Sequence, residues 1–217
     1  VPNFSLKDST FRTIVSSLLI SLFLASCSHN KVIIAHRGAS GVLPEHTLQG
    51  VAMAHAWGVD FIEPDIVLSK DGEAIVLHDI YLESTTNVKE IFPKRLRSDG
   101  HYYAIDFSLE EIKRLQVSER INPKTGMKVY PKRFPVKKSS FKVPTLKEYI
   151  ELVQGLNKST GQSIGIYPEI KRPSFHKKEG KDITSIVMKI LNSYGYLNGN
   201  DKVFVHQLSF RYILHAN

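Results

Sequence analysis

The chain has 217 residues, of which 42% are hydrophobic, and its aromatic and β-branched residues are plentiful. These values fit one globular domain and exclude general disorder. The formal net charge of +8 indicates affinity for anions, but it does not separate nucleic acids, anionic membranes and phosphate-bearing small molecules. Because the sequence has no zinc-finger spacing, no basic helix and no basic repeat interleaved with aromatic residues, we expect no nucleic-acid partner.

Residues 1–27 have the layout of a secretory signal peptide. Lys7 and Arg12 give a positively charged start, residues 13–25 are almost wholly apolar, and small residues precede Cys27. Because the apolar run is short for a membrane span, we interpret it as a signal and leave it out of the fold. Its ending resembles that of bacterial lipoprotein signals, so we expect lipidation at Cys27, which would become the mature N-terminus. An ordinary signal or a single anchor helix is the alternative.

The lipoprotein interpretation predicts an exported protein with a membrane anchor at its N-terminus. We therefore expect it in the bacterial periplasm, at the outer membrane or on the cell surface. Cys27 is the only cysteine, so no disulfide can form within the chain.

The first regular element after the signal is a short apolar run at residues 32–35, which predicts a buried strand. The strand ends in His36 and Arg37, and burying such a pair without partners is costly. Ligands bind at the carboxyl ends of strands in parallel α/β folds, so we expect a ligand site here. A surface loop that happens to be basic is the alternative. Apolar residues spaced three and four apart in the segment 48–55 then predict a helix, which Gly58 ends.

The second predicted strand covers residues 59–68 and carries Glu63 and Asp65 at its centre. The two acids are two residues apart, so on a strand their side chains point to the same face. Two carboxylates on one apolar face repel each other and lose hydration, and a divalent cation resolves both problems. We therefore expect a metal site. An edge strand with one solvated face is the alternative, because Pro64 removes a ladder donor.

A hairpin-like turn at residues 69–73 leads to the third predicted strand, residues 74–79. This strand also ends in a histidine with an acid beside it, at His78 and Asp79. A lone histidine at a strand end is more often structural than catalytic. In a parallel barrel, however, His36 and His78 would face the same mouth, so we expect both to belong to one site.

Residues 81–143 are less regular, and we interpret them as an insertion because a standard connection is much shorter. One short helix is expected at residues 109–117, where Ser108 and Glu111 have the spacing of a capping box. Residues 128–142 hold six basic residues and no acid. We interpret this run as a solvated loop, with a lid or a surface for anionic headgroups as the alternative.

The fourth predicted strand, residues 163–171, places Glu169 and Lys171 on one face. A third carboxylate and a second cation therefore reach the end of a strand. A surface ion pair is the alternative.

Two amphipathic helices flank this strand in the sequence. The first begins at Thr145, which has capping-box spacing to Glu148, and the second begins at Asp182 and ends near Gly195. A fifth strand is expected at residues 203–207.

The order of these elements predicts an α/β fold, because strands that alternate with helices form a parallel sheet covered by helices. Candidate functional groups recur at strand ends, as they do in a TIM barrel. A whole barrel typically needs about 250 residues and eight strands, whereas only about five strands can be counted here. We therefore interpret residues 28–217 as the N-terminal part of an incomplete barrel, from a fragment or a truncated gene product.

Four motifs in order resemble those of the glycerophosphodiester phosphodiesterase family, most closely its exported bacterial branch. They are Ala35-His36-Arg37-Gly38, Glu63-Pro64-Asp65, Leu77-His78-Asp79 and Pro168-Glu169-Ile170-Lys171. Three further stretches resemble the same branch, at residues 43–47, 99–107 and 176–182. The resemblance covers about residues 31–205. It implies a TIM barrel of the type found in phospholipase C-like phosphodiesterases, with an insertion, and hydrolysis of glycerophosphodiesters to glycerol 3-phosphate and an alcohol.

The resemblance also implies roles for the site residues. Three carboxylates would hold a divalent cation, often calcium in this branch, with magnesium as the other candidate: Glu63, Asp65 and Glu169. Two histidines would be the general acid and base, and two cations would bind the phosphate: His36 and His78, and Arg37 and Lys171. The substrate's own glycerol hydroxyl would attack first and give a cyclic phosphate, which water then opens.

Elementary chemistry agrees with these roles. A phosphodiester is anionic and repels nucleophiles, so a metal and two cationic side chains would stabilise the charge that develops at phosphorus. Proton removal from the attacking hydroxyl needs a base and the leaving alkoxide needs an acid, and histidines supply both near neutral pH.

Two other functions stay open. Residues 207–217 depart from the family pattern, which favours an inactive surface lipoprotein that acts as a binding or antigenic protein. A phospholipase-type relative acting on intact lipid is suggested by the tether and the basic insertion. That activity would need an apolar substrate entrance, which the sequence does not reveal.

Overall fold

The computed structural model describes residues 31–135, 140–196 and 202–206. The chain divides into two units, residues 1–32 and 33–217, and every helix and strand named below belongs to the second unit. The predicted signal peptide, the lipidation at Cys27 and the predicted departure after residue 207 lie outside the described residues. Within the described ranges, no helix combines the length and the apolar composition that crossing a bilayer requires.

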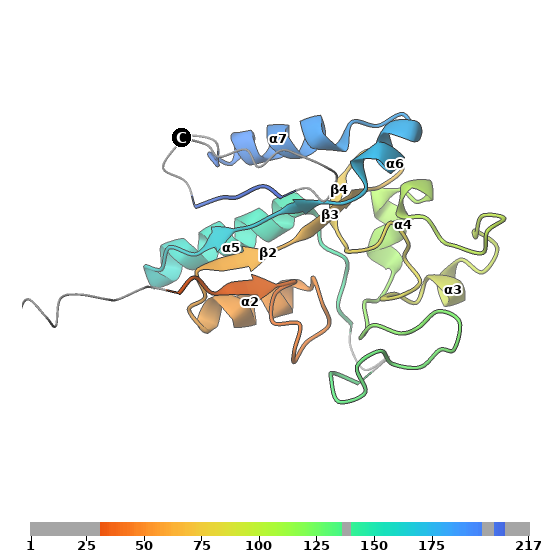
Figure 1. Cartoon of the computed structure of the whole chain (residues 1–217), viewed down its shortest axis with the longest axis horizontal. Coiled ribbons are helices and arrows are strands. Elements are labelled where there is room, and N and C mark those ends of the chain that lie inside the picture. Colours follow the sequence, from red (N-terminus) through yellow and green to blue (C-terminus); the bar gives the residue numbers. More distant parts are fainter. Residues whose placement is uncertain (1–30, 136–139, 197–201, 207–217) are drawn as a thin grey trace, which may run out of the picture. The chain divides into compact units, whose positions relative to one another are not determined.

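Short parallel strands form the centre of the fold (Figure 1). One sheet has the order β1-β2-β5 and a second the order β4-β3-β6. The strands are β1 (Ile34–His36), β2 (Phe61–Glu63), β3 (Asp65–Leu68), β4 (Ala74–Val76), β5 (Gly165–Ile166) and β6 (Glu169–Ile170). The pairs β1–β2, β2–β5 and β3–β6 are parallel. Val203 and His206 form parallel bridges to Ile166 and Glu169, so the fifth predicted strand continues this order through single bridges.

The second predicted strand is interrupted at Pro64, which separates β2 from β3. Proline has no N–H, but its carbonyl accepts from the Glu169 N–H at 2.8 Å, so pairing continues across the break. Because β2 lies between β1 and β5 and every residue of β2 and β3 is buried, the edge-strand alternative is wrong.

The third predicted strand differs most from expectation. β4 pairs antiparallel with β3 as the second arm of a hairpin, so it is not a parallel barrel strand. Ala74 lies opposite Leu68 and Val76 opposite Ile66, and the N–H of Leu77 donates to the carbonyl of Asp65. The hairpin therefore returns the chain to the level of Asp65, and His78 arrives there by a different route from the one the sequence predicted.

Helices pack on the strands to form the main core. They are α2 (Leu48–Ala56), α5 (Leu146–Thr160), α6 (Pro173–Lys178) and α7 (Ile183–Ser193). Buried residues of α2, α5 and α7 join Ile62 and Ile66 of the strands in one hydrophobic cluster. Thr145 and Glu148 complete the predicted capping box of α5, and the Asp182 side chain caps α7. α6 was not predicted.

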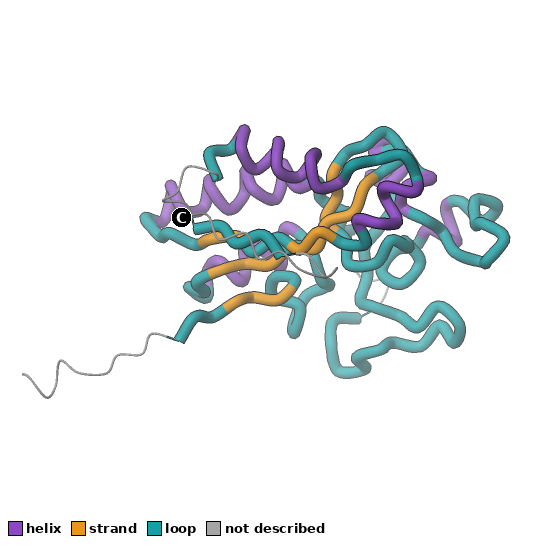
Figure 2. The backbone as a smooth tube through the Cα atoms, turned by 45° about the horizontal axis from the view of Figure 1, so that its top comes forward, coloured by secondary structure: helices purple, strands orange, loops and turns teal. Residues whose placement is uncertain are grey.

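The segment predicted as an insertion builds a second hydrophobic cluster on the hairpin. Its elements are α3 (Val88–Ile91), the 3₁₀ helix η1 (Ala104–Asp106) and α4 (Leu109–Arg114). Its buried residues, among them Leu82, Phe107 and Leu115, pack with Val67 and Ile75 of the hairpin strands. Figure 1 shows these elements in yellow-green beside β3 and β4, and Figure 2 shows how much of this region is loop. The capping box at Ser108 is present, although α4 ends three residues before the predicted boundary.

Candidate active site

Three buried carboxylates meet where the strands of the two sheets adjoin. One oxygen each of Glu63, Asp65 and Glu169 lies within 4.8 Å of the others, and all three residues are buried. Glu63 and Asp65 lie close together because only Pro64 separates the end of β2 from the start of β3. Strand pairing explains the third, since Asp65 lies opposite Glu169 in the β3–β6 register.

Cationic side chains surround Asp65. His46 Nε2 lies 2.8 Å and Arg37 Nε 3.3 Å from Asp65 Oδ2, and Lys171 Nζ lies 3.4 Å from Oδ1. Lys171 also contacts Glu169 Oε1 at 2.7 Å. Because the side chains of Lys171 and Glu169 are only 13% and 11% exposed, the surface-pair alternative for these two residues is wrong.

The loop after β1 brings Arg37 to this cluster in a constrained conformation. Arg37 and His46 both have φ of 60°, and the His46 N–H donates to the Arg37 carbonyl at 3.1 Å. Such left-handed conformations are unfavourable for residues with a side chain and cluster at functional sites. Between them, Gly38 has φ of 75°, and a Cβ there would lie 3.1 Å from the backbone of Gly50 in α2. The loop is therefore held against the helix, and the Arg37 side chain, 16% exposed, reaches the acidic cluster, whereas β1 is largely exposed and not buried as the sequence predicted.

His36 lies at the end of β1, opposite Glu63 in the strand register. Its side chain is exposed, and partial desolvation together with the charge of Arg37 lowers its pKa from the ordinary value. A neutral imidazole at this position can accept a proton.

His78 follows β4 and points toward a second acid. Its Nδ1 lies 2.6 Å from Asp79 Oδ1. Burial opposes ionisation of Asp79, but the hydrogen bond from His78 and the charge of Arg120 outweigh it and hold the pKa of Asp79 well below its usual range. An ionised carboxylate only accepts, so the Nδ1 of His78 carries the hydrogen and Nε2 is left for proton transfer.

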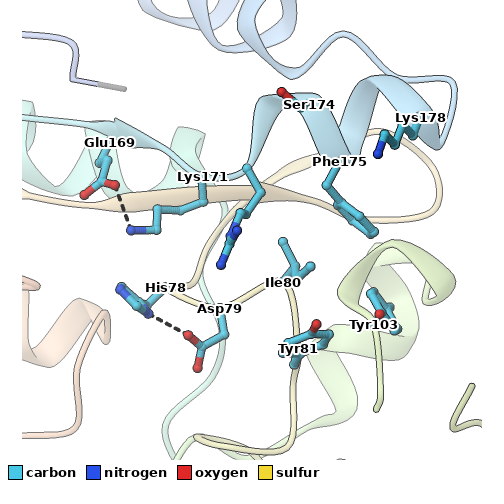
Figure 3. Close-up of a pocket in the computed structure, with 11 residues that line it drawn as sticks. His78, Asp79, Ile80, Tyr81, Tyr103, Glu169, Lys171, Ser174, Phe175 and Lys178 are labelled. Atoms are coloured by element: carbon cyan, nitrogen blue, oxygen red, sulfur yellow. Dashed lines mark hydrogen bonds and ion pairs between the residues drawn. The ribbon is translucent and has the colours of Figure 1, made fainter. Parts of the chain in front are cut away.

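A pocket of about 670 Å³ opens beside these groups. His78, Asp79, Glu169 and Lys171 line one part of it, and an aromatic part is formed by Tyr81, Tyr103 and Phe175. Figure 3 shows Lys171 reaching toward Glu169 on one side and His78 pairing with Asp79 below them. The pocket therefore brings together His78, a predicted proton-transfer group, Lys171, a predicted phosphate-binding group, and Glu169 of the acidic cluster.

The acidic cluster has the properties of a metal-binding site. Glu63 Oε1 and Asp65 Oδ1 are buried and accept no hydrogen bond within the described part of the chain, although Lys171 Nζ lies 3.4 Å from Asp65 Oδ1. Burial and the neighbouring Asp65 raise the pKa of Glu63 to about 8. Burial opposes ionisation of Asp65 too, but the hydrogen bond and charge of His46 and the charge of Lys171 outweigh it and lower its pKa. Hard divalent cations take such carboxylate oxygens, so these residues fit one.

Four participants were not assigned a role from the sequence: Glu45, His46, Asp79 and Arg120. Glu45 is buried and lies 3.3 Å from Arg37 Nη1, while Arg120 binds Glu45 at 2.6 and 3.0 Å. Burial opposes ionisation of Glu45, but the hydrogen bonds from Arg120 and the nearby positive charges lower its pKa to about 2. Glu45 and His46 lie in the stretch 43–47, which resembles the family, so a signal for them existed. Arg120 lies in the irregular insertion and carried no such signal.

Comparison with known proteins agrees with this geometry. Residues 36–217 match the model of the glycerophosphoryl diester phosphodiesterase family. The chain is 46% identical over 213 residues to a glycerophosphodiester phosphodiesterase of Haemophilus influenzae, covering 92% of this chain and 58% of that protein. It is 41% identical over 194 residues to one from Treponema pallidum, covering 88% and 54%. The chain thus spans a little over half the length of these curated relatives.

Solved structures share the fold. The phosphodiesterase of Oleispira antarctica, in complex with the product sn-glycerol-3-phosphate, has a TM-score of 0.58 and 23% identity, covering 83% of this chain and 58% of that one. The glycerophosphodiester phosphodiesterase of Agrobacterium tumefaciens has a TM-score of 0.56 at 23% identity, covering 82% and 58%. The few parallel strands found here are consistent with part of such a TIM barrel. This chain belongs to the glycerophosphoryl diester phosphodiesterase family.

Proposed function

We propose that this chain hydrolyses glycerophosphodiesters to sn-glycerol 3-phosphate and an alcohol, using a divalent cation. The observation that carries the proposal is the buried acidic cluster, in which Glu63 Oε1 accepts no hydrogen bond within the described ranges, next to a pocket lined by His78 and Lys171. Family membership gives the reaction class, and the product complex of the Oleispira relative supports the product.

Glu63, Asp65 and Glu169 would hold the cation, with Ca²⁺ as the first candidate and Mg²⁺ as the second. When bound, it would neutralise the phosphodiester and stabilise charge developing on the phosphoryl oxygens. Arg37 and Lys171 add positive charge beside the cluster, and both can donate hydrogen bonds to phosphate oxygens.

The two histidines would divide the proton transfers. His78 has its Nδ1 hydrogen fixed by Asp79, so its Nε2 can take or give one proton at the pocket. His36 would supply the complementary transfer from β1. In the first step the substrate's glycerol hydroxyl loses its proton and bonds to phosphorus while the alcohol leaves with a proton. In the second step water attacks and opens the cyclic phosphate, and the two histidines exchange their roles as acid and base.

The test is release of sn-glycerol 3-phosphate from glycerophosphocholine by the purified chain, with added calcium and with chelator. We expect release with calcium, loss of release with chelator, and restoration when calcium is returned in excess. A folded sample that releases nothing with calcium or magnesium would contradict the proposal. Hydrolysis of intact phosphatidylcholine, read as release of choline or phosphocholine, without hydrolysis of glycerophosphocholine would identify a phospholipase-type relative.

We propose in addition that the protein is exported and tethered to a membrane by lipid on Cys27. The support is the sequence pattern of residues 1–27, with an apolar run that ends in small residues before the cysteine. Expression in a bacterium with labelled fatty acid should label the protein, and Cys27→Ser should abolish the label. Equal labelling of the wild type and the variant would contradict the proposal.

A further inference from the structure

Arg120 belongs to the insertion, yet its side chain ends among the groups of the site. Its Nη2 and Nε bind the two oxygens of Glu45 at 2.6 and 3.0 Å, and its Nη1 binds Asp79 Oδ2 at 2.6 Å. The side chains of Arg120 and Glu45 are only 15% and 5% exposed. Three short, charge-assisted contacts from one planar guanidinium define its position closely.

The contact with Asp79 leads to His78. Arg120 holds Oδ2 of the carboxylate while His78 binds Oδ1, so the carboxylate is fixed between a cation and the imidazole. A carboxylate fixed in this way fixes the ring plane and keeps the hydrogen on Nδ1, as the buried aspartate of a catalytic triad does for its histidine. Without Arg120, Asp79 would lose its only described arginine partner and could turn toward solvent.

The contact with Glu45 leads to Arg37. Both oxygens of Glu45 lie 3.3 Å from Arg37 Nη1, longer than their contacts with Arg120. Arg120 is therefore the stronger ion-pair partner of the buried Glu45. Without it, Glu45 would draw Arg37 closer, and less of the Arg37 charge would be available to a phosphate.

We propose that Arg120 is a positioning residue for the reaction: it orients His78 through Asp79 and sets the place of Arg37 through Glu45. The inference rests on the proposed function and deepens it, because it gives the insertion a part in the chemistry. Arg120 acts through these two carboxylates and is not among the residues that line the pocket.

The backbone around Arg120 is built to hold it there. The N–H of Ile121 donates to the carbonyl of Ser84 at 2.8 Å, and the N–H of Val129 donates to the carbonyl of Arg120 at 3.0 Å. Ile121 and Lys128 form an antiparallel bridge. Arg120 therefore sits at the base of a hairpin that is tied to the segment just after His78, so a short path of backbone contacts joins the two residues.

The first experiment reads the imidazole of His78 directly. Nitrogen-15 NMR of the full chain labelled at histidine should show the Nδ1–H form of His78, assigned by its disappearance in His78→Asn. In Arg120→Gln we expect a mixture of Nδ1–H and Nε2–H forms. The control is Arg95→Gln, since Arg95 lies in the insertion and pairs with Glu111 away from the site. An unchanged His78 signal in Arg120→Gln would overturn the proposal whatever the activity.

The second experiment is kinetic and uses glycerophosphocholine with calcium. We expect Arg120→Gln to lower kcat by about 10–100-fold and to raise KM several-fold, and Arg95→Gln to change neither by more than about twofold. Arg120→Lys keeps the positive charge but cannot bind both carboxylates as a planar guanidinium does. Its kcat should therefore lie between those of the wild type and Arg120→Gln. Guanidinium added to Arg120→Ala should restore part of the rate.

The outcomes separate the two proposals. If the wild type releases no product but its His78 form changes in Arg120→Gln, the proposed function fails and the positioning role stands. If the wild type is active and Arg120→Gln keeps its kcat and KM within about twofold, the positioning role is wrong. If Arg120→Gln does not fold, the NMR and kinetic comparisons are made with Arg120→Lys, and wild-type values there would overturn the proposal.

Discussion

Two ion pairs of the insertion differ from the carboxylates at the strand ends. In the insertion, Arg95 pairs with Glu111 and Arg97 with Asp106, each at 2.7 Å, on side chains between 27% and 39% exposed. At the strand ends, Glu63 and Asp65 are buried, and Glu63 Oε1 accepts no hydrogen bond within the described ranges. Half-exposed pairs contribute little to stability, whereas buried, incompletely paired charge is costly. At Glu63 and Asp65 a bound divalent cation would offset this cost.

The largest effect should come from the acidic cluster. Glu63→Gln and Asp65→Asn keep the side-chain shape but remove a negative oxygen ligand, so we expect release of sn-glycerol 3-phosphate to fall by about 10³-fold or more. Glu111→Gln removes a carboxylate of the insertion and is the matched control, with a change below about twofold. Rates would be measured with saturating calcium. Comparable losses in all three variants would break the contrast between the two regions.

The histidines should give the next largest effect. We expect His36→Gln and His78→Asn each to lower kcat by about 10²–10⁴-fold with little change in KM, because they act on protons and not on binding. Steady-state kinetics with glycerophosphocholine checks this. A rise in KM with unchanged kcat would assign the histidines to binding instead.

His176 tests whether a charge placed on a buried side chain outside the site lowers the stability of the fold. It is buried in α6, neither ring nitrogen has a partner in the described part of the chain, and burial lowers its pKa to about 4. The folded state therefore binds this proton less readily than the unfolded state, whose histidine titrates near 6.5. Stability is present above about pH 6.5 and is lost as the pH falls toward 4.

We expect the titration of His176 to lower the free energy of unfolding by about 1 kcal/mol between pH 7 and pH 5. His176→Leu removes no described hydrogen bond, so its Tm should fall less than that of the wild type over the same pH range. Equal falls in Tm would show that His176 is not the responsible group.

The smallest effect concerns the cap of α4. Ser108→Ala removes the side-chain acceptor of the capping box and should lower stability by about 1 kcal/mol without changing kcat. Chemical denaturation and the release assay measure the two quantities. A loss of activity larger than the loss of folded protein would show that the insertion acts on the site through α4 as well.

Local patterns predicted the parts of the fold that depend on neighbouring residues. Capping boxes and apolar spacing located α4, α5 and α7, although α4 ends at Arg114 and Val117, within the predicted helix, forms a bridge with Thr86 instead. The two-residue spacing of Glu63 and Asp65 predicted that the acids lie together, and they do, although Pro64 divides the predicted strand between them. These inferences depend only on residues that lie within a few positions of one another in the sequence.

The rest depends on contacts between distant residues. The packing of the insertion on Val67 and Ile75 joins residues far apart in the sequence, whereas the antiparallel pairing of β4 follows from the local turn at residues 69–73. Arg120 meets Glu45 across 75 positions of sequence, and a lone arginine in an irregular segment carries no sign of its partner. The roles of the predicted site residues stay predictions, although the structure brings the three acids, Arg37 and Lys171 together.

The most direct test of the metal site is calcium binding to the chain at neutral pH, measured by calorimetry on metal-free protein. We predict one site that binds Ca²⁺ with release of a proton, because the Glu63 carboxyl has its pKa raised to about 8 and must ionise to bind the ion. Glu63→Gln should lose this binding and the proton release, and it should fold about as stably as the wild type without metal, since the Glu63 carboxyl is itself mostly protonated at neutral pH. Binding that is equally tight in the wild type and in Glu63→Gln would contradict the claim that the buried carboxylates form the metal site.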